Sequence, residues 1–320
     1  MDSQPESSER SSPFARPAYF TWTAVGLCVV VTVIHWSARG GLGDRMDAFL
    51  SATPSQIWDG RYYGLLSNVF LHGNLLHLAF NTVGLLVLGA VLERTVHAAL
   101  WLTFFVASAA VAYCAELAAS GNVAIGASGV VYAIFGLLWA GRYYQPAWRE
   151  VATPGIFWTF VGWGVICLVA SAFGYLHIAN AAHAGGFLFG LAVGWTIYAG
   201  KRRPAAFAVV AILGIIVVLS LTWMPWSLAW ILWRASKAEK SADYGVAITY
   251  FRRSLPMGAN PEPVWQKISD LEVLRGNMNA AREARIEALE AAAVAKETSS
   301  RGWNLFRQSP SAESETRSIP

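Results

Sequence analysis

A serine between glycines stands at the start of an apolar stretch of the sequence. The motif Gly126-Ala127-Ser128-Gly129 follows the polar break 120–122 and opens a helical run from Val130 to Tyr144. Neither glycine has a Cβ, so another group can approach the serine hydroxyl closely. At a helix start the serine N–H has no helical partner, and the helix dipole favours negative charge there. The motif therefore suits a nucleophile that generates an oxyanion, although small residues also pack membrane helices together.

Two other apolar runs carry the polar residues that such a nucleophile needs. His77 and Asn81 are four residues apart and share one helix face, whereas His72 points elsewhere or lies at the helix entrance. His183 lies in a later run. Ionisable residues inside a membrane span are costly and are functional candidates by default. A structural hydrogen bond explains one such histidine by itself. Together with the glycine-flanked serine, the set favours a serine activated by a histidine base.

A glycine-lined helix face can bring the histidine to the serine. Spacings of three, four and four residues put four residues on one face: His183, Gly186, Gly190 and Gly194. Small residues four apart let two membrane helices approach closely. If the partner is the helix that begins at Ser128, His183 lies beside that serine. Tyr132, one turn after Ser128, then either stacks on the imidazole ring or fills the core.

The composition indicates a membrane protein. The 320 residues are 55% hydrophobic and 14% charged, whereas soluble domains contain about 25% charged residues. Spans need about 20 apolar residues each, and we expect seven, at residues 18–36, 67–92, 98–119, 128–144, 155–173, 180–199 and 205–223. The three cysteines lie in separate apolar runs, so they predict neither a disulfide framework nor a zinc site. We expect no metal and no cofactor.

The predicted fold is an all-α polytopic membrane bundle followed by a small helical segment. The expected order is a disordered cytoplasmic tail (1–17), a core of six transmembrane helices (18–200), a seventh transmembrane helix with an interfacial segment (205–233), a helical segment (241–295) and a disordered tail (298–320). The helical segment repeats at an offset of 34 residues, as in Asp243/Asn277 and Ala247/Ala281. This period is that of the tetratricopeptide repeat. An amphipathic helical hairpin explains it equally, because fewer than the three repeats of a usual array fit.

The distribution of basic residues predicts the orientation. Arginine and lysine occur in the loops after the second, fourth and sixth spans, at Arg94, Arg142, Arg149 and 201–203, and are absent around Gly121 and Tyr175. The first loop, with three arginines, departs from this bias. The positive-inside rule places the basic loops and the N-terminus in the cytoplasm. The side above Ser128 then faces outward, and a seventh span brings segment 241–295 to that side, where it can bind a protein partner.

The separate motifs together resemble those of rhomboid intramembrane serine proteases. The family's GxSG motif corresponds to residues 126–129, and its following tyrosine corresponds to Tyr132. Its second-helix pattern HxxxxHxxxN and the glutamate that closes that helix correspond to His72, His77, Asn81 and Glu93. His183, within 180–186, corresponds to the general base. The resemblance extends from Trp58 to Gly194, with the motifs in the family's order.

The resemblance implies roles for these residues. Ser128 would attack the peptide carbonyl, and His183 would take its proton and return it to the leaving amine, without a third acidic residue. The Ser128 N–H, His77 and Asn81 would stabilise the oxyanion. The residues with supporting roles would be Gly126, Gly129, Tyr132, His72, Asn180, Gly186 and Gly190. One departure is that Tyr63 and Gly64 stand where many members carry a Trp-Arg pair.

The resemblance also implies the cellular setting. The site would lie below the membrane surface of a bacterial inner membrane and open to the extracytoplasmic side. The substrates would be transmembrane proteins, with the lipid bilayer as surroundings and no nucleic acid as partner. The main alternative is a catalytically inactive rhomboid-like protein that binds membrane clients. A transporter is disfavoured because no repeat of the span pattern occurs. A membrane metalloprotease is disfavoured because the sequence has no H-E-x-x-H motif.

Overall fold

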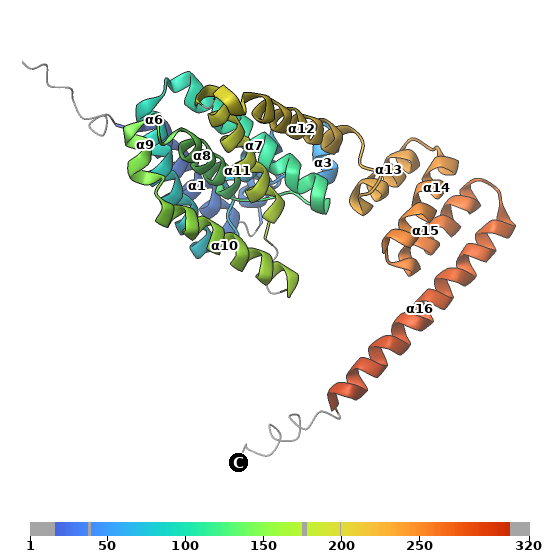
Figure 1. Cartoon of the computed structure of the whole chain (residues 1–320). Helices are drawn as coiled ribbons and strands as arrows, with labels where there is room; N and C mark the ends of the chain where they lie inside the picture. Colours follow the sequence, from blue (N-terminus) through green and yellow to red (C-terminus); the bar gives the residue numbers. More distant parts are fainter. Residues whose placement is uncertain (1–16, 38–39, 175–177, 199, 308–320) are drawn as a thin grey trace, which may run out of the picture. The chain divides into compact units, whose positions relative to one another are not determined.

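The computed structural model describes residues 17–37, 40–174, 178–198 and 200–307, and its regular structure there is helical throughout (Figure 1). The chain divides into two compact units, residues 1–224 and 225–320. Five helices of the first unit are long and apolar enough to cross a membrane. They are Tyr19–Ser37 (α1), Leu75–Thr95 (α5, a π turn and α6), Ala98–Ser120 (α7), Pro154–Ala172 (α10) and Gly200–Thr222 (a 3₁₀ turn and α12). The prediction of an all-helical polytopic membrane protein is confirmed.

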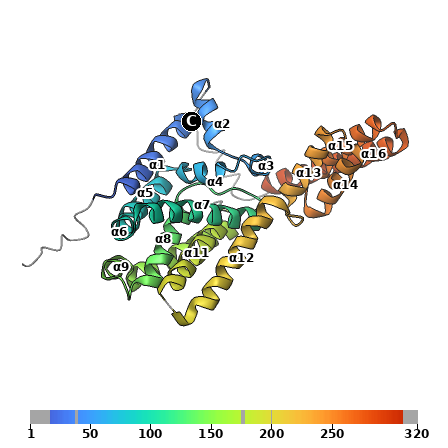
Figure 2. The same cartoon turned by 90° about the horizontal axis from the view of Figure 1, so that it is seen from above.

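Two of the seven expected spans are not among these five. The helix α8 (Ser128–Gly141) has 14 residues, fewer than the roughly 20 that a span needs. The helix α11 (Asn180–Tyr198) has 19 residues, but glycine and alanine make up much of it. Both are packed inside the unit, since most side chains of α8 are buried and α11 lies beside α8, α7 and α12 (Figure 2).

The second predicted span begins later than expected. We predicted a helix from residue 67, but the chain forms a short helix at Gly64–Ser67 (α4) and a 3₁₀ turn at Asn68–Phe70 before α5 (Leu75–Gly84) begins. Asn74 starts α5, because its side chain accepts a hydrogen bond from the His77 N–H at 2.9 Å. The helix then continues through a π turn at Leu85–Gly89 into α6 (Ala90–Thr95). His72 therefore lies in the loop before the helix.

The glycine face of α11 packs on α8. A Cβ at Gly186 would collide with the Gly129 carbonyl oxygen, and a Cβ at Gly190 would collide with that of Ala133. Glycine is thus required at both positions for the backbones to approach this closely. The predicted contact between these two helices is confirmed. It holds the N-terminal turns of α8 and α11 side by side.

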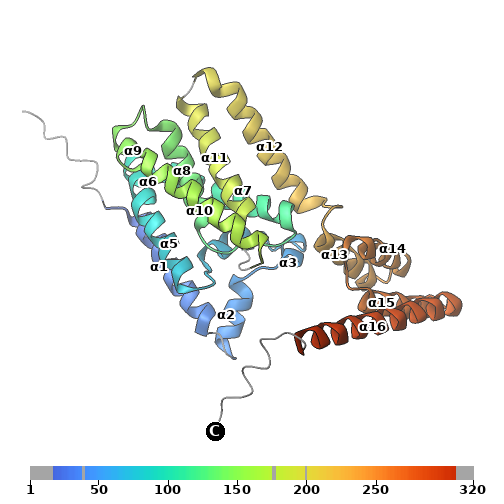
Figure 3. The same ribbon diagram turned by 60° about the horizontal axis from the view of Figure 1, so that its bottom comes forward.

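The remaining helices of the first unit surround this pair. Glu93 in α6 accepts hydrogen bonds from the Phe20 and Thr21 N–H groups at 2.9 and 2.7 Å, and so caps α1. The first loop contains α2 (Leu42–Leu50) and α3 (Pro54–Trp58), and the Trp58 indole donates to the Ser220 carbonyl of α12 at 2.8 Å. In α10, all of which the structure describes, Cys167 alone is buried, so this helix lies at the periphery (Figure 3).

The second unit consists of two helical hairpins. These are α13 (Leu228–Lys240) with α14 (Tyr244–Ser254), and α15 (Pro261–Leu274) with α16 (Met278–Arg307). Asp243 and Asn277, which are 34 residues apart, have the same role: Asp243 caps α14, and Asn277 caps the start of α16. The side chain of Ala235 lies in the core of this unit. We grouped residues up to 233 with the seventh span as an interfacial segment, whereas the division of the chain places α13 in the second unit. The helix α16 extends past residue 298, where we expected a disordered tail.

Candidate active site

Ser128 is the first residue of α8, and the loop before it is firmly held. The Gly126 N–H donates to the Asn68 carbonyl at 3.0 Å, and the Tyr113 hydroxyl donates to the Gly126 carbonyl at 2.8 Å. Gly126 has a φ of +96°, which residues with a Cβ rarely adopt. An added Cβ would also come within 2.6 Å of His77 Cε1. The glycine two residues before the serine is therefore required by both its backbone conformation and the adjacent histidine ring.

His183 lies against the serine. The two side chains form a hydrogen bond of 2.7 Å between His183 Nε2 and Ser128 Oγ. The His183 side chain is buried, and its Nδ1 has no hydrogen-bond partner in the described part of the chain. The arrangement is therefore a pair rather than a triad with an acidic third member. Ser128 is half-buried, so its hydroxyl is set into the helical bundle.

Tyr132 supports the imidazole ring from one side. The two rings are stacked, with centroids 4.6 Å apart and planes 11° apart. The Tyr132 hydroxyl donates to the Phe160 carbonyl of α10 at 3.1 Å. Of the two alternatives left open for Tyr132, the structure shows the stacking. It restricts rotation of the imidazole ring away from the serine.

His77 and Asn81 lie on α5, on the other side of Gly126. Asn81 is buried, and its Nδ2 donates to the His77 carbonyl at 2.7 Å, one helical turn back. The His77 ring packs against the His72 ring, with centroids 5.0 Å apart. The structure therefore brings His77 close to the serine loop. The role of both residues toward an oxyanion stays a prediction.

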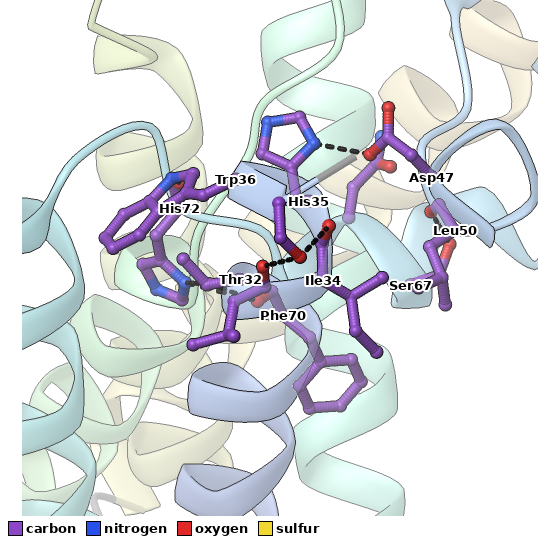
Figure 4. A network of polar contacts seen from close by, with 12 residues as sticks. Thr32, Ile34, His35, Trp36, Asp47, Leu50, Ser67, Phe70 and His72 are labelled. Carbon is purple, nitrogen blue, oxygen red and sulfur yellow. Dashed lines mark hydrogen bonds and ion pairs between the residues drawn. The ribbon is translucent and has the colours of Figure 1, made fainter. Parts of the chain in front are cut away.

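His72 belongs to a polar network between α1 and the first loop (Figure 4). Its ring is fully buried, and its Nδ1 lies 3.1 Å from Thr32 Oγ1. Its carbonyl accepts a hydrogen bond from the Trp36 indole at 2.9 Å. In the same region His35 pairs with Asp47 of α2. These contacts indicate that His72 fixes the loop before α5 to α1, rather than contacting Ser128.

The departure from the family pattern at Gly64 has a packing reason. A Cβ at Gly64 would collide with that of Ala52, and Ile57 Cδ1 would lie 2.9 Å from it. The neighbouring Tyr63 ring stacks on Phe49 of α2, with centroids 5.2 Å apart. The first loop therefore closes over position 64 and leaves no room for an arginine there.

Sequence reasoning missed two residues of the site region, Tyr113 and Glu116 on α7. Tyr113 holds the serine loop, and the Glu116 carboxylate accepts hydrogen bonds from the first turn of α11. Glu116 could have been found, because a carboxylate inside an apolar run is costly unless it has partners. No comparable signal marks Tyr113. Asn180, which we predicted to support the site, donates to the Ser171 hydroxyl of α10 at 2.9 Å.

The fold and the site together define a helical membrane protein with a serine–histidine pair among its packed helices. Comparison with known proteins then finds a matching family model: residues 59–200 match the model described as the Rhomboid domain. This part of the chain is therefore similar to a rhomboid domain. This span includes Ser128, His183 and every other residue that we predicted for the site.

Known proteins similar to the chain include bacterial rhomboid proteases. The chain is 29% identical over 197 residues to Rhomboid protease GlpG of Klebsiella pneumoniae (strain 342), a match that covers 57% of this chain and 65% of the relative. The match to Rhomboid protease GlpG of Salmonella typhi, over 198 residues, has the same identity and coverage. The chain therefore spans somewhat less than two thirds of the length of these relatives.

Proposed function

We propose that this chain is an intramembrane serine endopeptidase that cleaves transmembrane segments of membrane proteins. The observation that carries this proposal is the 2.7 Å hydrogen bond between Ser128 Oγ and His183 Nε2 within a rhomboid domain. A serine hydroxyl is a weak nucleophile until a base can take its proton. The burial of the pair suits a substrate that reaches the site from the membrane.

The proposed reaction uses the two side chains in turn. Ser128 Oγ attacks the peptide carbonyl as His183 Nε2 takes the hydroxyl proton. The same nitrogen then gives that proton to the leaving amine. The peptide C–N bond breaks, and the acyl group stays on the serine as an ester. Water hydrolyses this ester with His183 again as the base. The stacked Tyr132 ring keeps the imidazole aligned with Ser128 through both steps.

The oxyanion would be stabilised by the Ser128 N–H, His77 and Asn81. The N–H group at the first residue of α8 has no helical partner, and the helix dipole favours negative charge there. The Asn81 amide carries two N–H bonds, and the hydrogen bond to the His77 carbonyl occupies one of them. The second remains for the oxyanion. The His77 ring is adjacent to Gly126, two residues before the nucleophile.

We further propose that α8 and α11 complete a six-helix core and that α12 is a seventh transmembrane helix. The basic residues 142, 149 and 201–203 follow the C-terminal ends of α8 and α11, opposite the ends that carry Ser128 and His183. This supports a site that opens to the extracytoplasmic side of a bacterial inner membrane. The second unit would be a tetratricopeptide-like segment that binds a protein partner, as paired-helix repeats commonly do.

Reconstituted protein and a single-span reporter substrate test the proposal. We expect Ser128→Ala and His183→Ala each to abolish cleavage, and the double variant to be no worse, because the two groups act as a unit. A fluorophosphonate probe should label the wild type at Ser128 and neither single variant. Normal cleavage by Ser128→Ala protein would rule out the protease. Absence of both labelling and cleavage in the wild type would instead favour an inactive client-binding protein.

A further inference from the structure

Glu116 is a buried carboxylate with unusual partners. Its side chain lies near the C-terminal end of α7 and is 8% exposed. One of its oxygens, Oε2, accepts hydrogen bonds from the backbone N–H groups of Ala181 and Ala182, at 3.0 and 3.3 Å. Within the described part of the chain, no lysine or arginine forms an ion pair with it. A buried charge of this kind is retained only where its hydrogen bonds compensate for lost hydration.

These two N–H groups belong to the first turn of α11, and no side chain of residues 178–180, the described residues at its start, caps that turn. The first N–H groups of a helix lack helical partners and are normally satisfied by a polar side chain just before the helix. Here that position is Ala179, which offers no acceptor. The Asn180 amide is engaged with Ser171. Glu116 therefore supplies, from another helix, the cap that the local sequence lacks, and its charge faces the positive end of the α11 dipole.

The capped turn is the one that carries the base. His183 directly follows Ala182, and the His183 N–H donates to the Ala179 carbonyl at 3.3 Å. The helices α7, α8 and α11 meet at this level, since a Cβ at Gly129 would lie 2.6 Å from the Ala112 Cβ and 3.4 Å from the Ala182 carbonyl oxygen. Ala112 and Glu116 are four residues apart on one face of α7. Glu116 thus ties the first turn of α11 to the helix that also packs against the serine turn.

We propose that Glu116 is a positioning residue for the reaction: it caps α11 from α7 and so holds His183 Nε2 at bonding distance from Ser128 Oγ. The inference rests on the proposed protease function. Loss of the cap lets the first turn of α11 unwind or shift. A displacement of about 1 Å at a catalytic group can lower a rate on the order of 10²-fold. We therefore expect kcat to change more than KM.

The test compares kcat and KM on the reporter substrate at a temperature below every thermal transition. Glu116→Ala should lower kcat by about tenfold or more and change KM by less than about threefold. Glu116→Gln retains an acceptor oxygen of similar reach and should keep kcat within about threefold of the wild type. Ala179→Asp places an acceptor at the local capping position. It should restore most of the lost kcat in the Glu116→Ala background.

Glu93→Ala is the matched control, because that carboxylate caps α1 in the same way, through the Phe20 and Thr21 N–H groups, and not α11. It should lower the thermal midpoint and leave kcat within about threefold. Three outcomes would each overturn the inference. They are a wild-type kcat in Glu116→Ala, an equal loss of kcat in Glu116→Ala and Glu93→Ala, and a double variant with Ala179→Asp that folds but does not regain kcat. If the Glu116→Ala single variant does not fold, the test compares kcat of the Glu116→Ala/Ala179→Asp double variant with kcat of the Ala179→Asp single variant. Similar kcat values would support the inference, and a lower kcat in the double variant would overturn it. Wild-type protein that neither cleaves nor reacts with fluorophosphonate would contradict the protease instead.

Discussion

At the scale of residues, the site is a histidine and a serine whose surroundings limit what else they can contact. The His183 ring is fixed on one face by Tyr132, and its Nε2 bonds to Ser128. Its second nitrogen is buried without a partner in the described part of the chain. The imidazole orientation therefore depends on packing and on the position of α11, whereas in a triad a carboxylate orients the ring.

The Asn81 amide is open to a direct test. We expect Asn81→Ala to lower kcat with little change in KM, because an oxyanion donor acts mainly in the transition state. Loss of one such donor costs on the order of 10²–10³ in rate in a soluble protease. With a backbone donor in reserve, we expect the lower end of that range or less. Initial rates over a range of substrate concentrations give both constants.

Thr82→Ala is the control for this substitution. Thr82 is the next residue of α5, and its hydroxyl likewise donates to the helix backbone, at the Leu78 carbonyl. It lies on a different face from Asn81, so kcat should stay near that of the wild type. An Asn81→Ala protein with normal kcat and a raised KM would contradict the oxyanion role.

At the scale of elements, the contact between α8 and α11 sets the distance between nucleophile and base. Several glycines, which have only a hydrogen as a side chain, lie in this contact, among them Gly129, Gly136, Gly186, Gly190 and Gly194. Each lets backbone or small side-chain atoms of the neighbouring helix approach. The two helices start at the same level, so their first turns present Ser128 and His183 to each other. Bulk added anywhere along this contact must separate them.

Gly190→Leu tests this contact without touching the site. The added side chain would meet the Ala133 carbonyl, and overpacking typically costs about 1–3 kcal/mol. We expect a lower thermal midpoint in detergent and lower proteolytic activity together. Gly214→Leu on α12 is the control, since no atom lies within 4 Å of the added Cβ. Equal thermal midpoints for the two variants would show that the glycine face is not the limiting contact.

At the scale of the whole molecule, the number of crossings decides which side of the membrane each unit occupies. The helix α12 follows α11 with a short basic turn between them, at residues 200–202. Its hydropathy and length are those of a span. If α12 crosses fully, the chain after residue 224 leaves the membrane on the side of the serine. The second unit would then work outside the cytoplasm.

Single introduced cysteines test this topology. Ser241→Cys and Arg202→Cys can be probed in intact cells with a membrane-impermeant maleimide, and the native cysteines are buried, so they give little background. We expect labelling of Ser241→Cys and protection of Arg202→Cys until the cells are permeabilised. The reverse pattern would overturn both the orientation and the placement of the second unit. Labelling of neither position would mean that α12 does not cross.

The sequence by itself determined the helical class, most span boundaries and the pairing of a glycine face with the serine helix. These features are local, because a run of about 20 apolar residues or a spacing of four along a helix is visible in the chain itself. The predicted limits of α7 and α10 lie within one residue of those in the structure. The motif around Ser128 likewise predicted that a helix starts at that residue.

Only the tertiary structure decided which side chain serves which backbone group. Glu116 caps a helix that begins 64 residues later, Tyr113 holds the serine loop, and Gly64 has no Cβ because Ala52 lies over it. The start of α5 at Leu75 and the inclusion of α13 in the second unit were also missed. Each depends on contacts between segments or on a choice among competing caps. Periodicity along the chain carries no record of such contacts, because it reports the face of a helix and not its neighbour.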